Sequence, residues 1–237
     1  MGQPLISCII PVFNGERSLR EALDSIWAQT YRPLEIIVVD DGATDTTPAV
    51  AACYGDRIRY VIQDNAGAPT ARNLGLSLAR DEFLAFLDSD DLWHPEKLKR
   101  QMRRFEAHPE LDLCVTYLRN FWIAELKNEE NRFKGHRLSE PVPGYVTQTL
   151  LSRRSAFHRV GPFDHTLRVG HPADWFLRAG EQGLVTEMLP DVLVDRRMHE
   201  SNMSMQAGTR RMTSRMQDSM LRVVKASLDR RRLGHKN

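Results

Sequence analysis

Four short apolar runs, separated by segments with helical spacing, constrain the fold of this chain more than any other feature of its sequence. The runs are LISCII (5–10), LEIIVV (34–39), IRYVI (58–62) and FLAFL (83–87). Strands that are apolar on both faces and alternate with helices predict a mainly parallel sheet covered by helices. We therefore expect an α/β fold with a Rossmann-like central sheet.

The segments between and after these runs carry further patterns. Within residues 16–29, Leu19, Leu23 and Ile26 recur at helical spacing. We expect further helices from Thr47, over 68–79, from Pro95 and over 173–182, and strands over 112–122 and 184–196. Residues 147–164 predict a strand followed by a short helix. The second half is therefore less regular than the first.

Turns with polar and acidic side chains follow three of the predicted strands, at residues 11–14, 40–41 and 88–91. Ligands bind beyond the carboxyl ends of the strands in sheets of this kind, so we expect these turns at one edge. An isolated Asp-Gly turn is commonly a solvated turn, but Asp88, Asp90 and Asp91 repel one another unless a cation is present. Hard oxygen ligands suit Mg²⁺ or Mn²⁺, which bridge carboxylates to substrate phosphates. Phosphotransfer, nucleotidyl transfer and glycosyl transfer all fit this prediction.

The composition is that of an ordinary globular protein, with 41% apolar and 27% charged residues in a chain of 237. The longest apolar runs are of strand length, far short of the roughly 20 residues that a membrane-spanning helix needs. We find no signal-peptide pattern and expect a cytoplasmic protein. Three widely spaced cysteines, Cys8, Cys53 and Cys114, predict buried thiols and not a disulfide framework or a zinc site.

The net charge of +2 hides an uneven distribution. From residue 206 onward there are nine Lys/Arg and two Asp/Glu, a balance of +7, which leaves −5 for the preceding residues. An acidic body without interleaved aromatic and basic residues argues against nucleic-acid binding. Residues 208–233 carry Met212, Met216, Met220, Val224 and Leu228 at steps of four, which predicts an amphipathic helix.

Seven stretches of the chain form a recognisable series: SCIIPVFNGERSLREALDSIWAQTY, EIIVVDDGATDTT, NAGAPTARNLGL, FLAFLDSDDLWHPEKL, GPFD, ADWFLRAG and RRMHESNMS. In this order they resemble the motifs of family 2 glycosyltransferases with the GT-A fold. Each one is weak by itself, but together they cover residues 4 to about 205. The resemblance implies an inverting transferase that takes its sugar from a nucleotide-sugar donor, usually a UDP-sugar.

The resemblance also assigns residues to the donor site. Asp41 aligns with the carboxylate that accepts hydrogen bonds from the base. Pro11 and Phe13 match the segment that lines the base pocket, with Phe13 placed to stack on the base. Arg72 is expected to contact the donor phosphates or to brace the aspartates. The alternative is an arginine on the helix surface.

The Asp-x-Asp motif of the family matches Asp88, Ser89 and Asp90. By that match Asp90 holds Mn²⁺ or Mg²⁺, while Asp88 contacts the ribose or the metal, and Asp91 supports the loop. His199 matches a late motif whose histidine completes the metal shell or touches the diphosphate. A purely structural histidine is the alternative.

Asp174 matches the family's general base, which removes the proton of the acceptor hydroxyl. The preceding position is often acidic in the family and is Ala173 here, which removes one acceptor contact. The alternative for Asp174 is a carboxylate favoured by the dipole at the start of a helix.

We divide the chain into a nucleotide-sugar-binding half (1–110), an acceptor-binding and catalytic half (111–205) of the same domain, and a basic C-terminal helix (206–237). The expected acceptor is a carbohydrate or a lipid-linked molecule. Residues 127–141 are a candidate lid. Arg153, Arg154 and Arg168 either meet an anionic acceptor or are solvated. The Gln-x-x-Arg-Trp motif of processive members is absent, so we expect one sugar per binding event.

Three interpretations remain open for the C-terminal helix: a solvated helix packed through its Met/Val stripe, a homodimer contact, or peripheral docking on an anionic membrane. Three rivals to the transferase also remain. They are a nucleotidyltransferase, a degenerate fold that binds the nucleotide sugar without turnover, and a signalling receiver domain. A receiver domain needs a lysine downstream at the end of a strand, and this chain offers no convincing one.

Overall fold

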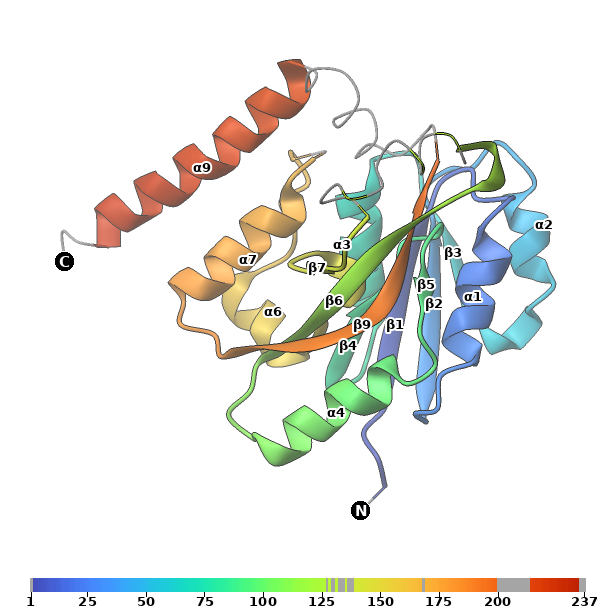
Figure 1. The fold of residues 1–237 in the computed structure, drawn as a ribbon, viewed down its shortest axis with the longest axis horizontal. Coiled ribbons are helices and arrows are strands. Elements are labelled where there is room, and N and C mark those ends of the chain that lie inside the picture. The colour runs from blue at the N-terminus through green and yellow to red at the C-terminus, as the bar shows by residue number, and fades with distance from the viewer. Residues whose placement is uncertain are drawn as a thin grey trace.

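A curled nine-stranded sheet with helices on both faces forms the body of the computed structural model (Figure 1). The structure describes residues 2–126, 128, 131, 135, 139–167, 169–199 and 214–234. The strand order is β3-β2-β1-β4-β8-β6-β9-β5, and β7 pairs with β6. The architecture confirms the expected α/β fold.

The first four strands are parallel, as predicted. They are β1 (Ile6–Val12), β2 (Leu34–Asp40), β3 (Arg59–Ile62) and β4 (Phe83–Phe86). All seven residues of β1 are buried, because helices cover both faces of the sheet at this strand. The predicted strand at 5–10 ended too early, since the structure continues β1 through Pro11 to Val12.

Helices α1 (Leu19–Trp27), α2 (Thr47–Ala52), α3 (Ala68–Leu78) and α4 (Lys97–Ala107) lie between and after these strands. Two apolar clusters, one on each face, make the core. Helix α3 approaches β1 closely at Gly75, where an added Cβ would lie 2.4 Å from the Ile9 side chain. Only glycine permits that separation.

The strands after β4 add mostly antiparallel pairs to the same sheet. Its strands are β5 (Leu92–Trp93), β6 (Leu113–Trp122), β7 (Val142–Pro143), β8 (Leu151–Arg153) and β9 (Thr186–Met198). The helices α6 (Arg154–Val160) and α7 (His171–Glu181) pack against one face of the sheet. β8 is antiparallel to β4 and β6, whereas β6 and β9 run parallel. The long β9 returns the chain to the edge where β4 ends.

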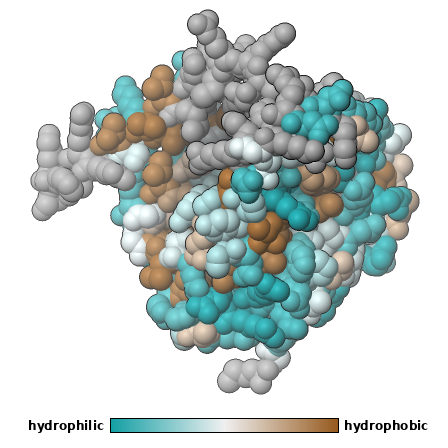
Figure 2. Space-filling model, viewed as in Figure 1, coloured by the Kyte–Doolittle hydropathy of each residue, from teal (hydrophilic) through white to brown (hydrophobic). Residues whose placement is uncertain are grey.

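Helix α9 (Ser214–Gly234) lies beside α7, away from the sheet (Figure 1). Among its described side chains Val223 and Ser227 are buried, whereas Val224 is 52% and Leu228 50% exposed. The prediction that the stripe at steps of four packs on the body is therefore wrong for Val224 and Leu228. The side chains of Met212, Met216 and Met220 lie outside the described residues. Hydrophobic side chains are visible on the side of the molecule where α9 lies (Figure 2).

No helix in the described ranges is both long enough and apolar enough to cross a lipid bilayer.

Candidate active site at the carboxyl edge of the sheet

The ends of β1, β2 and β4 meet at one edge of the sheet. Val12 lies opposite Asp40 in the register, and the Asp41 amide donates to the Val12 carbonyl over 2.8 Å. The amide of Leu87, just after β4, donates to the Ile9 carbonyl over 3.0 Å. The three predicted turns therefore start from adjacent strands.

Asp88, Asp90 and Asp91 each offer a carboxylate oxygen within 4.8 Å of the others. Asp91 is the inner member, 1% exposed, and accepts hydrogen bonds from Gln148 Nε2 (2.8 Å) and the Arg197 backbone (2.9 Å). Burial and then the charges of Asp90 and Asp88 raise the pKa of Asp91 well above its usual range. Asp91 thus ties the loop to β9, and the crowded negative charge is suited to a cation.

Asp90 contacts His199, the residue that follows β9. His199 Nε2 lies 2.8 Å from Asp90 Oδ2, and both side chains are partly exposed. Arg197 Nε also donates to the Asp90 carbonyl over 2.9 Å. A partly exposed carboxylate beside an imidazole and a second carboxylate is a donor set that fits a divalent cation such as Mn²⁺.

Asp88 is paired with Arg72 of α3, whose guanidinium is buried. Arg72 is 4% exposed, so the alternative of a surface arginine is wrong. Its second terminal nitrogen, Nη1, lies 2.7 Å from His171 Nε2, at the start of α7. His171 was not singled out in the sequence, because nothing local distinguishes a histidine whose partner lies 99 positions away.

Asp41 is buried and holds the loop that precedes α3. Its carboxylate accepts hydrogen bonds from Gln63 Nε2 (2.7 Å), the Ala66 amide (2.9 Å) and the Gly67 amide (2.8 Å). Gly67 has a φ of +92°, a conformation that favours glycine. Asp41 is therefore fixed in place at the same edge as the aspartate cluster.

The remaining donor-site candidates differ in exposure. Phe13 is 50% exposed, directly after β1. Pro11 is buried inside β1, opposite Val39, and not in the turn as expected. Ser89 is partly buried between Asp88 and Asp90. The accessible part of the first loop thus begins at Phe13.

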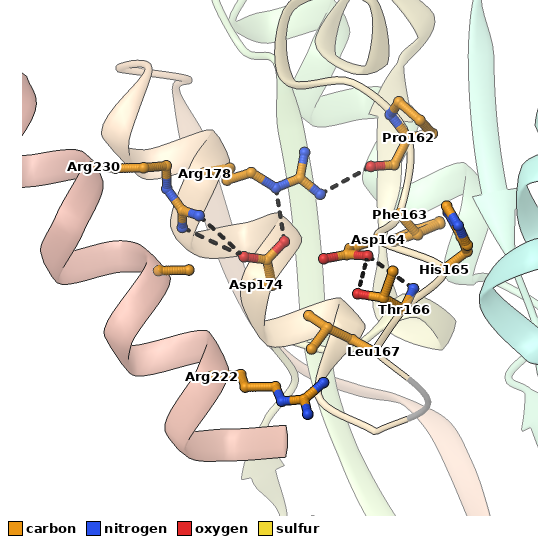
Figure 3. A pocket seen from close by; sticks show the side chains of 11 residues that line it. Pro162, Phe163, Asp164, His165, Thr166, Leu167, Asp174, Arg178, Arg222 and Arg230 are labelled. Carbon is orange, nitrogen blue, oxygen red and sulfur yellow. Dashed lines mark hydrogen bonds and ion pairs between the residues drawn. The ribbon is translucent and has the colours of Figure 1, made fainter. Parts of the chain in front are cut away.

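Asp174 lies in a different environment, in a pocket between α7 and α9 (Figure 3). Its Oδ2 accepts from Arg178 Nε over 2.8 Å, and its Oδ1 lies 3.4 Å from both terminal nitrogens of Arg230. In the described part of the chain, every hydrogen bond or ion pair of this carboxylate is to an arginine. Loop residues 162–167 and Arg222 complete the pocket.

Two arginines proposed for an anionic acceptor lie at the opposite edge of the sheet. Arg153 pairs with Glu82 (2.5 Å) and Arg154 donates to the Asp81 carbonyl (2.5 Å), both at the amino end of β4. That interpretation is therefore wrong for these two. Arg168 and most of the candidate lid at 127–141 lie outside the described residues.

Curated relatives of the chain carry glycosyltransferase names. An uncharacterized glycosyltransferase of Rickettsia typhi is 32% identical over 211 residues, which are 84% of this chain and 65% of that protein. A putative glycosyltransferase, EpsH of Bacillus subtilis, is 36% identical over 117 residues, 48% of this chain and 34% of EpsH. The chain thus spans less than two thirds of the length of these relatives.

Solved structures share the fold at low sequence identity. S. aureus TarS 1-349 in complex with UDP-GlcNAc gives a TM-score of 0.70 at 19% identity, over 92% of this chain and 65% of that one. The mannosyltransferase PcManGT from Pyrobaculum calidifontis, in complex with GDP-Man and Mn²⁺, gives 0.67 at 20% identity, over 85% and 59%. These likenesses confirm the GT-A type of architecture.

The family model described as glycosyl transferase family 2 matches residues 7–164, more than half of the chain. The match begins inside β1, contains β2 to β8 and the aspartate cluster, and ends in the loop that precedes α7. This chain belongs to glycosyl transferase family 2.

Proposed function

We propose that this protein is an inverting, non-processive glycosyltransferase that moves a sugar from a UDP-sugar to an acceptor hydroxyl and depends on a divalent cation. The observation that carries the proposal is the arrangement of Asp88 and Asp90 with Arg72 and His199 at the carboxyl edge of a family 2 fold. The nucleotide sugars and the Mn²⁺ named for TarS and PcManGT support it.

The donor nucleotide would lie across the loops that follow β1 and β2. Phe13 offers an exposed ring for stacking on the base. Asp41 would accept hydrogen bonds from the base edge with its remaining lone pairs, since its position is already fixed by three donors. Pro11, in β1 directly before this loop, supports it from within the sheet, and Asp88 and Ser89 would face the ribose.

Asp90 and His199 would hold Mn²⁺ or Mg²⁺, which neutralises the negative charge that develops on the leaving diphosphate. Arg72 would keep Asp88 in position through the pair described above. Asp91 would hold the loop by its bonds to Gln148 and to the Arg197 backbone.

Asp174 is the proposed general base, and its two arginine contacts set a condition on that role. The acceptor oxygen would form a bond to the anomeric carbon while the bond to the diphosphate oxygen breaks, and the acceptor proton would pass to the Asp174 carboxylate. A base must come within hydrogen-bond distance of that hydroxyl. Arg230 of α9 would therefore have to leave Oδ1 when the acceptor binds.

A calorimetric screen of nucleotide sugars, with and without Mn²⁺, tests the proposal. We expect one UDP-sugar to bind only with the metal present and UDP to be released when an acceptor is supplied. Binding of no nucleotide sugar in the presence of Mn²⁺ would sink the proposal. Release of a sugar 1-phosphate in place of UDP would identify a nucleotidyltransferase.

The arginine contacts of Asp174 favour one second candidate, a protein that binds a nucleotide sugar without transferring it. Both carboxylate oxygens of the proposed base are already engaged. Donor binding with no transfer to any carbohydrate or lipid-linked acceptor would support this candidate over the enzyme.

We also propose that the acceptor is lipid-linked and that α9 contacts an anionic membrane. Its exposed Leu221, Val224 and Leu228 lie in a segment with a balance of +7. Sedimentation with vesicles tests the contact, and we expect binding to vesicles with anionic lipid but not to neutral ones. The variant Leu221→Glu should weaken it. A concentration-dependent dimer in solution, without vesicle binding, would assign this face to a second copy.

A further inference from the structure

We propose that His171 is a positioning residue of the donor site, where its neutral ring holds the Arg72 guanidinium against Asp88. The inference rests on the proposed function, because the donor and the metal are what the positioned aspartate would serve. It links the start of α7, in the second half of the chain, to the aspartate cluster in the first.

The geometry of this connection is a chain of three side chains. Asp88 accepts from Arg72 Nη2, and Arg72 Nη1 lies 2.7 Å from His171 Nε2. Arg72 and His171 are each 4% exposed. A buried guanidinium needs partners for its donors, so the imidazole fixes the direction in which Arg72 presents its other nitrogen to Asp88.

The imidazole is itself held by the ring of Phe163. The Phe163 ring packs edge-to-face on it, with centroids 5.8 Å apart. Phe163 is in turn fixed to α3, because the Asn73 side chain donates to its carbonyl (2.8 Å) and accepts from its amide (3.0 Å). His171 and Arg72 therefore belong to one rigid unit that joins α3 to the loop before α7.

The ring is uncharged in this environment. Burial first, and then the charge of Arg72, lower the pKa of His171 to about 3. A neutral imidazole has one nitrogen that accepts, and the Arg72 contact requires it to be Nε2. The proton then resides on Nδ1.

The absence of charge on His171 has a consequence for the aspartates. Asp88 is the carboxylate that pairs with the Arg72 guanidinium, and a neutral neighbour adds no competing negative charge. Arg72 thus offsets Asp88 and leaves Asp90, with His199, to face a cation. A carboxylate at position 171 would divide the charge of Arg72 between two acids and loosen its hold on Asp88.

Three variants separate positioning from folding. His171→Phe keeps the ring but removes the acceptor, His171→Gln restores a neutral acceptor, and Phe157→Leu weakens the same aromatic cluster without touching Arg72. Calorimetry would measure the Kd of UDP with Mn²⁺, and thermal unfolding the Tm. We expect His171→Phe to weaken UDP binding about tenfold, the size of one buried hydrogen bond to a charged group. His171→Gln should recover most of that loss, and Phe157→Leu should lower Tm with an unchanged Kd.

Nitrogen-15 NMR of the histidine rings gives a readout that does not depend on nucleotide binding. We expect a neutral His171 with its proton on Nδ1 from pH 8 to pH 5. A proton on Nε2, or an unchanged Kd in His171→Phe beside a wild-type protein that binds UDP, would overturn the inference alone. A wild-type protein that binds no nucleotide with Mn²⁺ would overturn the proposed function, and the NMR result would still decide the geometry.

Discussion

The aspartate cluster at 88–91 and the Asp174 pocket are both acidic sites beside arginines, but their charge balance differs. In the cluster, three carboxylates lie within 4.8 Å of one another, and Arg72 pairs with one of them. In the pocket, the single carboxylate of Asp174 contacts two arginines, Arg178 and Arg230, and Arg230 also pairs with Glu181. An excess of negative charge needs a ligand, whereas a carboxylate between two arginines is already neutralised as a cross-link between helices. The charges around a carboxylate therefore bear on its role as much as its match to a motif does.

Replacing Asp90 tests the excess negative charge in the aspartate cluster and should have the greatest consequence. Asp90→Asn removes one negative charge and the contact with His199, so UDP binding should lose its dependence on Mn²⁺. Sugar transfer should fall about a thousandfold, because a metal contributes several kcal/mol to leaving-group stabilisation. Calorimetry and UDP release would measure both. Asp229→Asn, on the exposed side of α9, is the matched control and should behave as wild type. Metal-dependent binding that survives Asp90→Asn would contradict the assignment.

The second effect tests whether the neutralised carboxylate can still act as a base. Asp174→Asn should lower transfer about a hundredfold or more while the Kd of the donor stays within twofold, since general-base catalysis contributes about 10² to 10⁴. Glu181→Gln is the control, because Glu181 also pairs with Arg230 but lies at the far end of α7. Unchanged turnover in Asp174→Asn would leave this residue a structural role alone.

The third prediction concerns Lys97, a buried amine that has no carboxylate partner among the described residues. Lys97 is fully buried, donates to Gln101 Oε1 over 2.8 Å and lies over the Trp93 ring at 4.2 Å. Burial lowers its pKa from 10.5 to about 7. The unfolded chain therefore binds a proton between pH 7 and 10.5 that the folded protein does not, so stability should rise with pH over that range.

Lys97→Met should abolish that slope and stabilise the protein at pH 7 by about 1–3 kcal/mol, because no ammonium group is then desolvated. Urea unfolding at pH 7, 8.5 and 10 would measure the difference. Lys99→Met, on the same helix and only partly buried, controls for the loss of a lysine. A slope that persists in Lys97→Met would place the titration elsewhere.

The smallest expected effect concerns the access to Asp174. Arg230→Gln removes the contacts at 3.4 Å and leaves Arg178 in place. If Arg230 must move for the base to act, transfer should rise about two- to fivefold, a size typical of a partly exposed ion pair. Lys225→Gln, one turn earlier and exposed, should change nothing. A fall in transfer would instead mean that Arg230 takes part in the site.

The sequence predicted the first four strands of the fold well, because each of them is a continuous apolar run and periodicity identifies such elements directly. It also predicted the aspartate cluster, since three neighbouring carboxylates are an anomaly visible without structure. The resemblance suggested His199, and the structure brings it within 2.8 Å of Asp90.

Other parts could not be predicted, because they depend on contacts between distant segments. The partners of Asp91 and Arg72, Gln148 and His171, lie 57 and 99 positions away. The face of α9 that packs was predicted wrongly, since periodicity identifies stripes but not the side on which the neighbouring helix lies. Val223 and Ser227, both outside the predicted stripe, are the buried residues among the described side chains of this helix.

The close approach of α3 to β1 at Gly75 has a consequence for the donor site. The space for a methyl group is missing there, so the helix can move away from the sheet but not toward it. Arg72 lies three residues earlier on the same helix, and any widening of that gap would draw its guanidinium off Asp88. The packing of Gly75 on Ile9 thus limits the positions that Arg72 can take relative to Asp88.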